Sequence, residues 1–271
     1  MRYSRLPRFA KLVMALSAAV ALAAPMNFVL IQPAEPVALF PKTIAVKDLP
    51  TYPVDGQMYL LAVYVTNPET KVLGAEVLGC WVIGRCAVLP RSVIYSREST
   101  DKSERAAGSK EMSQSQSAAV LAAKSEIAKH FPSTHISQLS DASLKVNLEN
   151  VGGPSAGVVF TLGLIDLLTP ENLLDGRKIA GTGTVDRKGR VGEIGGVQEK
   201  IMAAKSAHAS VIFVPTENCS DLPRRVEGIS VVALTTIDQA IGYLQARAGD
   251  GSPGWKILNS AGIHGCANLG A

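Results

Sequence analysis

Short hydrophobic runs rich in β-branched side chains recur along the chain and predict strands. The clearest is GQMYLLAVYVTN at residues 57–68, because aliphatic and aromatic side chains of this kind favour a pleated sheet. Four shorter runs predict further strands, at 143–148, 178–185, 210–215 and 229–234. The polar tetrapeptide DRKG at 186–189 predicts the turn that follows one of them.

Segments of helical composition lie between these strands. Residues 155–168 are apolar on nearly every face except at Asp166, which predicts a fully buried helix. Three other segments predict helices, at 112–130 (with an apolar stripe at 119, 120, 123 and 127), 197–209 and 236–246. The alternation of strands and helices predicts an α/β (α+β) domain, and the charged stretch 99–111 predicts an exposed loop.

The N-terminal hydrophobic run is of a different kind. Residues 12–31 contain no charged side chain, and a helix of that length just crosses the hydrocarbon core of a bilayer. We therefore expect residues 1–35 to form a basic cytoplasmic end and a single transmembrane anchor, with the rest of the chain outside the cytoplasm. Ala21-Leu22-Ala23 also resembles a signal-peptidase site, so a cleaved signal peptide is the alternative. Proline-rich residues 36–56 predict a spacer, and Gly/Pro-rich residues 248–271 predict a tail.

The net charge of +4 comes from the N-terminal end. Four basic residues lie before or at the start of the apolar run, at Arg2, Arg5, Arg8 and Lys11; without them, the remaining basic residues balance the 23 acidic ones. No basic stripe with interleaved aromatic residues follows, which argues against nucleic-acid binding. The sequence also has no GxxxxGK[ST] motif, so neither a nucleotide nor another cofactor is expected.

The chain has four cysteines, an even number that suits an exported protein. Their order along the chain favours two disulfides, Cys80–Cys86 and Cys219–Cys266, and four unpaired buried thiols are the alternative. The four histidines do not cluster with the cysteines at the spacing of zinc ligands. No metal site is therefore expected.

Ser155 lies in the glycine-rich hexapeptide GGPSAG, residues 152–157, where the predicted buried helix begins. One interpretation is a helix cap, since serine is a favoured N-cap residue, although Val158 stands where a capping box has Glu or Gln. The other is a nucleophile elbow, because Gly153, Ser155 and Gly157 fit the GxSxG pattern. In such a turn the hydroxyl is exposed beside main-chain N–H groups that can hold an oxyanion.

A serine nucleophile needs a base, and Lys200 in GGVQEK is the candidate. On a helical wheel of residues 197–209, Lys200 lies in the middle of the small apolar stripe, whereas Lys205 lies on the polar side. Burial there lowers a lysine pKa and makes a neutral amine available as a general base. The alternative is a lysine that reaches solvent from the first turn of the helix.

Two separated stretches, VGGPSAGVVFTLGLIDLL and IAGTGTVDRKGRVGEIGGVQEKIMAAKSAHASVIFVPTENC, resemble the proteolytic domain of Lon-type serine proteases. The likeness is greatest to membrane-anchored bacterial Lon-like proteases that carry no ATPase. It is dense over 143–247 and implies a Lon proteolytic fold over 57–247, behind the N-terminal anchor.

The resemblance implies a Ser–Lys catalytic dyad. The family's nucleophile falls on Ser155, its lysine on Lys200 and an assisting threonine, which orients the lysine, on Thr182. Main-chain amides of the turn around Ser155 would form the oxyanion hole, at Gly153, Pro154 and Ala156. Many members of the family assemble as rings, which makes a homo-oligomer possible here.

Relatives of this kind often carry a PDZ domain before the serine motif, but here only residues 131–142 fill that interval, which is too short for a domain. We therefore expect an ATP-independent, extracytoplasmic serine endopeptidase that cleaves unfolded or membrane-proximal proteins and is held in the cell membrane through residues 12–31. Two alternatives use the same fold, an anchored non-catalytic scaffold that binds proteins and a Ser–Lys amidohydrolase that acts on small amides.

Overall fold

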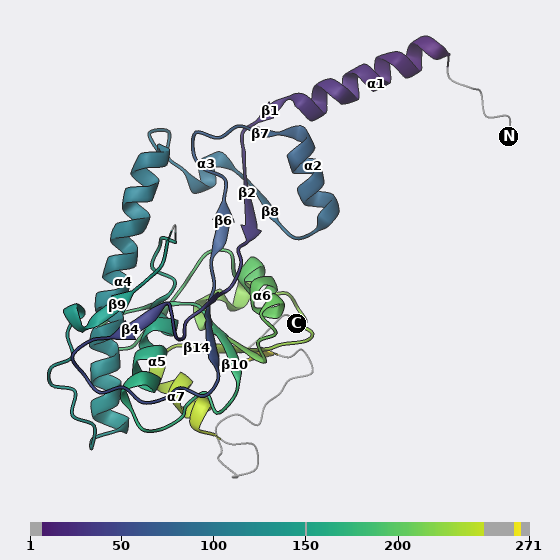
Figure 1. The fold of residues 1–271 in the computed structure, drawn as a ribbon. Helices are drawn as coiled ribbons and strands as arrows, with labels where there is room; N and C mark the ends of the chain where they lie inside the picture. The colour runs from purple at the N-terminus through teal and green to yellow at the C-terminus, as the bar shows by residue number, and fades with distance from the viewer. Residues whose placement is uncertain (1–6, 150, 247–262, 267–271) are drawn as a thin grey trace. The chain divides into compact units, whose positions relative to one another are not determined.

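The computed structural model of the chain describes residues 7–149, 151–246 and 263–266 (Figure 1). The chain divides into two compact units. Unit 1 comprises Met1–Pro33 and Tyr64–Glu104, and unit 2 comprises Ala34–Val63 and Arg105–Ala271. Each unit therefore takes two separate stretches of the chain, whereas the sequence predicted consecutive domains.

Unit 2 is built on a six-stranded sheet in the order β15-β14-β13-β10-β5-β3. The strands from β15 to β5 pair in parallel, and β3 pairs antiparallel with β5 at one edge. The bounds are β3 (Val37–Ala38), β5 (Gln57–Leu60), β10 (Lys178–Gly181), β13 (Val211–Pro215), β14 (Ser230–Leu234) and β15 (Ile263–His264). Two short antiparallel pairs belong to the same unit, β4 (Ile44–Val46) with β9 (Leu144–Val146) and β11 (Thr184–Val185) with β12 (Val191–Gly192).

Helices cover both faces of this sheet. They are α4 (Asp101–His130), α5 (Gly157–Leu168), α6 (Val197–Ser206) and α7 (Ile237–Gln245). One hydrophobic core joins α4, α5 and α7 to sheet residues such as Ile179 and Phe213. The other core joins α6 to Ala180 and Ile212, which are the sequence neighbours of Ile179 and Phe213. Successive side chains of a strand point to opposite faces, so the two cores lie on opposite sides of the sheet. This confirms the predicted α/β class and the buried helix at α5.

The exposed loop predicted at 99–111 is wrong, because α4 begins at Asp101. Thr100 caps the helix, since its hydroxyl accepts from the Ser103 N–H at 3.1 Å and the Ser103 hydroxyl accepts from the Thr100 N–H at 2.9 Å. No residue of α4 before Met112 is buried. The polar composition that suggested a loop therefore belongs to a solvated helical segment.

The spacer predicted at 36–56 is also wrong. This stretch contributes β3 and β4, and its side chains Leu39, Phe40 and Ile44 are buried in the core of unit 2. The strand predicted at 57–68 is divided into β5 and a separate strand, β6 (Val63–Val65). The predicted tail includes β15 and the disulfide-bonded Cys266, whereas its residues 248–262 and 267–271 lie outside the described residues.

Unit 1 combines a small sheet with three helices. The sheet has the order β6-β2-β8, and β2 (Phe28–Pro33) pairs antiparallel with β8 (Ala87–Pro90). A second pair joins β1 (Pro25–Met26) to β7 (Val72–Leu73). The helices are α1 (Arg8–Ala23), α2 (Gly74–Ile83) and α3 (Arg91–Ile94). Both predicted disulfides are present, with Cys80–Cys86 in unit 1 and Cys219–Cys266 in unit 2.

The continuous apolar span predicted at 12–31 is divided in the structure. Helix α1 ends at Ala23, and the second half of the run forms β1 and most of β2. Pro25 explains the break, because a residue before proline is disfavoured in the helical conformation. Among the residues that the structure describes, no helix combines the length and the hydrophobicity needed to cross a membrane.

Candidate active site

The turn that carries Ser155 packs against helix α4. The Gly153 N–H donates to the Gly108 carbonyl at 2.9 Å, and the Ser115 hydroxyl donates to the Pro154 carbonyl at 3.0 Å. Gly153 has a φ of 92°, a conformation that favours glycine. These contacts fix the backbone on the N-terminal side of Ser155.

The residues that follow β10 hold the other side of the turn. The Ser155 carbonyl accepts from the Gly183 N–H at 2.9 Å and from the Thr182 hydroxyl at 3.3 Å. A Cβ atom at Gly157 would lie 2.7 Å from the Val185 nitrogen, so glycine allows the first turn of α5 to approach β11. Ser155 therefore lies at the carboxyl end of a parallel strand, which is where open α/β sheets bind their ligands.

The Ser155 side chain does not cap helix α5. The N-cap position is Ala156, and no side chain makes a capping bond there. Within the described stretches the Ser155 hydroxyl has no hydrogen-bond partner, and the residue is partly exposed. The helix-cap interpretation is therefore wrong, and the hydroxyl is available for chemistry.

Main-chain donors beside this hydroxyl differ from those predicted. The Gly153 N–H is already bonded to Gly108, and Pro154 has no N–H, so both can only shape the turn. As far as the chain is described, the N–H groups of Ser155 and Ala156 donate to no protein acceptor. An oxyanion could therefore bind these two groups, of which the sequence indicated only Ala156.

Lys200 lies in the first turn of α6 and is only 3% exposed, whereas Lys205 is exposed. Burial lowers the pKa of Lys200 to about 8, although the neighbouring Glu199 carboxylate opposes this shift. Among the described residues Lys200 forms no ion pair. The alternative of a solvent-exposed lysine is therefore wrong, and the amine is partly neutral near neutral pH.

The structure brings Thr182 and Ser155 together, but it shows no hydrogen bond between the Ser155 hydroxyl and the Lys200 amine. Thr182 is completely buried, and its main-chain N–H donates to the Phe213 carbonyl of β13 at 3.0 Å. Its hydroxyl bonds the Ser155 carbonyl, so a role in orienting Lys200 stays a prediction.

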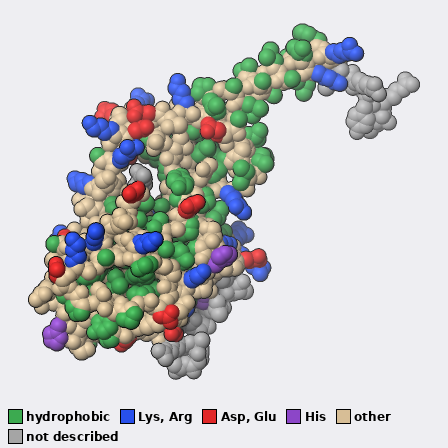
Figure 2. All heavy atoms as spheres, viewed as in Figure 1, with side chains coloured by type: hydrophobic (Ala, Val, Ile, Leu, Met, Phe, Trp, Pro, Cys, Tyr) green, Lys and Arg blue, Asp and Glu red, His purple; other side chains and the backbone are tan. Residues whose placement is uncertain are grey.

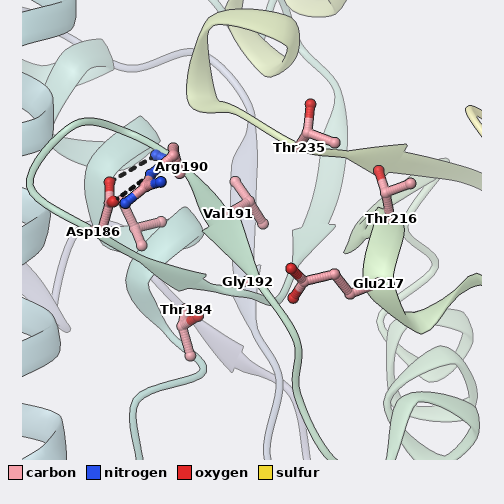
Figure 3. A pocket seen from close by; sticks show the side chains of 9 residues that line it. Thr184, Asp186, Arg190, Val191, Gly192, Thr216, Glu217 and Thr235 are labelled. Atoms are coloured by element: carbon pink, nitrogen blue, oxygen red, sulfur yellow. Dashed lines mark hydrogen bonds and ion pairs between the residues drawn. The ribbon is translucent and has the colours of Figure 1, made fainter.

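A hollow of about 450 Å³ opens beside β11 (Figure 3). Its lining comes from residues in and after β11 and residues directly after β13 and β14, namely Thr184, Val185, Asp186, Arg190, Val191, Gly192, Thr216, Glu217 and Thr235. Arg190 and Asp186 form an ion pair in it at 2.6 Å. Thr184 follows directly on the Thr182–Gly183 pair that bonds Ser155, so the hollow occupies the same carboxyl edge of the sheet. Sequence reasoning missed it because three separate parts of the chain line it.

A second polar cluster is formed by Glu126, His130 and Asp238, whose potential ligand atoms lie within 4.8 Å of one another. It is the only such group in the described parts of the chain that could hold a metal ion. The Asp238 carboxylate already accepts hydrogen bonds from Lys129 and from His130, the latter at 2.8 Å. Because the Lys129 charge balances one carboxylate, we assign the cluster to holding α4 against α7. It contains none of the predicted site residues.

Comparison with known protein families identifies the domain that contains this site. The C-terminal proteolytic domain of Lon protease (S16) matches residues 108–245, about half of the chain. The chain belongs to this Lon family. The matched segment contains Ser155, Thr182 and Lys200.

Individual Lon proteases align with a shorter part of the chain. The Lon protease of Koribacter versatilis is 39% identical over 94 residues, that of Haemophilus influenzae is 35% identical over 95 residues, and Lon protease 2 of Bacillus subtilis is 30% identical over 105 residues. These alignments cover 33%, 34% and 38% of this chain, but only 11%, 12% and 19% of the respective relatives. The chain thus corresponds to a small part of each of these Lon proteases.

Proposed function

We propose that the chain is a Lon-type serine endopeptidase that hydrolyses peptide bonds in unfolded proteins, with Ser155 as nucleophile and Lys200 as general base. The observation that carries the proposal concerns the described residues, among which the buried lysine has no ion pair and the serine hydroxyl, on a turn fixed by main-chain bonds, has no hydrogen bond. Both residues lie in the segment that matches the Lon proteolytic domain.

The proposed reaction begins with proton transfer from the Ser155 hydroxyl to the neutral Lys200 amine. The serine oxygen attacks the peptide carbonyl carbon, and the N–H groups of Ser155 and Ala156 stabilise the oxyanion. Lys200 then returns its proton to the leaving amine, and water hydrolyses the acyl-enzyme. The transfer requires hydrogen-bond distance between Lys200 Nζ and Ser155 Oγ, a contact that substrate binding would complete.

The hollow beside β11 would receive a substrate side chain close to the scissile bond. Two features of its position support this use. It follows directly on Thr182 and Gly183, which bond the Ser155 carbonyl, and it is open at the carboxyl edge of the sheet. Through its bond to the Ser155 carbonyl, the Thr182 hydroxyl would hold Ser155 in position relative to Lys200.

We further propose that the enzyme acts outside the cytoplasm, at the membrane and without ATP. All four cysteines are paired, which suits an oxidising compartment, and the uncharged run 12–31 is preceded by basic residues. No Walker motif occurs in these 271 residues. Assembly into a homo-oligomeric ring is part of this proposal, by analogy with the Lon family.

Cleavage of casein by the purified chain without nucleotide tests the proposal. Ser155→Ala is expected to abolish cleavage, whereas Ser125→Ala, at an exposed position of α4, should leave the rate unchanged. Equal cleavage by both variants would exclude Ser155 as the nucleophile. Turnover of small amides without casein cleavage would favour the amidohydrolase, and binding of casein without any cleavage would favour the scaffold.

A further inference from the structure

Helix α2 of unit 1 ends in a concentrated group of exposed hydrophobic side chains. Trp81, Val82 and Ile83 are 79%, 71% and 68% exposed, and Leu78, one turn earlier, is 48% exposed. We call these four residues the α2 tip. Isolated exposed apolar residues are ordinary, but a contiguous group of large ones marks an interaction surface.

The α2 tip is held in place by the residues around it. Cys80 is buried against Leu30 and Val72, and its disulfide to Cys86 closes the loop that presents the tip. Gly84 ends the helix in a left-handed conformation, and its N–H donates to the Cys80 carbonyl at 3.0 Å. The exposed side chains are therefore part of a fixed structure and not of a loosely attached loop.

The charges beside the α2 tip are basic. Arg85 follows the tip directly and lines one hollow with Ile83, and no acidic residue occurs in the sequence between Glu76 and Glu98. Glu76 lines the same hollow, but its carboxylate accepts from the Leu73 N–H at 2.7 Å at the start of α2. A surface with large apolar side chains, a tryptophan and a nearby arginine complements the interface of a bilayer that contains anionic lipids.

Helix α1 is a second exposed apolar element of the same unit. None of its residues is buried, and its apolar side chains are exposed around the helix. In Figure 2 hydrophobic side chains cover α1, with basic side chains at its N-terminal end. The start of α2 packs closely on the end of α1, since the Gly74 N–H donates to the Ala24 carbonyl at 3.1 Å and a Cβ at Gly74 would clash with the Ala21 carbonyl.

We propose that the α2 tip is a lipid-binding site, which inserts Trp81, Val82 and Ile83 into the headgroup region of an anionic bilayer. The exposed apolar side chains on both helices, together with Arg85 directly after the tip, favour lipid over a second copy of the chain, whose own tip would bring the same basic residue. This site is independent of the chemistry proposed for Ser155.

Fluorescence of Trp81 in the full chain tests the site. Trp255 is the other tryptophan, so a Trp255→Phe variant reports on Trp81 alone. With vesicles of phosphatidylcholine and phosphatidylglycerol, we expect a blue shift, quenching by brominated lipid and protection from aqueous iodide. If Trp81 of vesicle-bound protein stays open to iodide and is not quenched by brominated lipid, α1 alone binds and the proposal is overturned. Protection from iodide without vesicles, rising with protein concentration, would instead identify a second copy as the occupant.

Matched variants distinguish insertion of the α2 tip into the bilayer from a general effect of exposed hydrophobic side chains in unit 1. Replacing Trp81, Val82 and Ile83 together by serine should lower the partition coefficient on these vesicles by about tenfold or more, because three large apolar side chains lose their burial. Tyr64→Ser removes an aromatic side chain that is also exposed in unit 1 and should change partition less than about twofold. Equal losses, or no loss in the triple variant, would refute the site.

Discussion

Asp166 and Lys200 are both buried in unit 2, and they differ in what surrounds their charge. Each is 3% exposed. The Asp166 carboxylate accepts from the Leu173 N–H at 2.8 Å, yet burial still raises its pKa to about 6. Lys200 has its pKa lowered to about 8 by burial, and its amine has neither an ion pair nor a hydrogen bond in the described structure.

The difference is what we expect if Asp166 has a structural role and Lys200 has the proposed chemical role. Asp166 fixes the loop after α5 through one carboxylate oxygen, which gives its burial a structural explanation, although its Oδ2 atom has no hydrogen-bond partner in the described structure. Lys200 makes no such bond to any described residue, and burying an unpaired ammonium group costs free energy. Groups with shifted pKa values and no structural task cluster at functional sites, which supports Lys200 as the catalytic base. Neutral replacements of similar shape can test this comparison.

Replacing Lys200 by methionine should have the largest effect. We expect Lys200→Met to lower kcat/KM for casein by about 10²–10⁴-fold, because the proton acceptor is removed. Lys205→Met, in the same helix but exposed, should stay within about twofold of the unmodified chain. A Lys200→Met enzyme with full activity would remove Lys200 from the mechanism.

The same variant should be more stable than the unmodified chain. The folded-state pKa of Lys200 is below its ordinary value of 10.5, so the unfolded chain binds the proton more tightly between pH 8 and 10.5. Stability from this group therefore rises with pH across that window, and it is lowest near neutral pH. Lys200→Met should raise the free energy of unfolding by about 1–3 kcal/mol near pH 7 in denaturant titrations. A loss of stability would show that Lys200 has structural bonds.

Thr182 should have an intermediate effect on activity. Thr182→Val removes the hydroxyl that bonds the Ser155 carbonyl but keeps the shape, and we expect kcat to fall about 10-fold with little change in KM. Thr182→Ser retains the hydroxyl and should keep most of the activity. Equal losses in both variants would point to packing by the threonine methyl group instead.

Asp166 should affect stability alone. Because burial raises its pKa from 3.8 to about 6, the folded protein keeps a proton that the unfolded chain releases, and stability falls as pH rises from about 4 to 6. Asp166→Asn retains the acceptor for Leu173 and removes this fall, so it should be about 1–2 kcal/mol more stable near pH 7 and no more stable near pH 4. Casein cleavage should be unchanged. A large loss of activity would place both buried groups in the mechanism.

Hydrophobic patterning predicted much of the central sheet and its helices, because the structure that these segments favour locally is also the one that buries their apolar side chains in the core. Residues 210–215 and 229–234 form β13 and β14, and the apolar segment after Ser155 forms α5. Patterning was misleading where the amino-acid composition of a segment is typical of a different structure from the one it forms. The charged start of α4 was mistaken for a loop, and the proline-rich 36–56 stretch was mistaken for a spacer although Leu39 enters the core.

The site could be predicted only in part. A helical wheel was enough to place Lys200 on a buried face, and GxSxG was enough to suggest the elbow. The contacts of Gly153 with Gly108 and of Ser155 with Gly183 join parts of the chain far apart in sequence. No local pattern reveals such contacts, and they decide which N–H groups are available for an oxyanion.

The pH dependence of kcat/KM for casein tests most directly whether Lys200 is the base. Between about pH 6 and 9.5, kcat/KM should rise as a single group loses its proton and level off above an apparent pKa of about 8, the value to which burial lowers Lys200. The Thr182→Ser enzyme should show the same midpoint. A profile that is flat over this range, or that bends near the ordinary histidine pKa of about 6.5, would contradict a Ser155–Lys200 dyad.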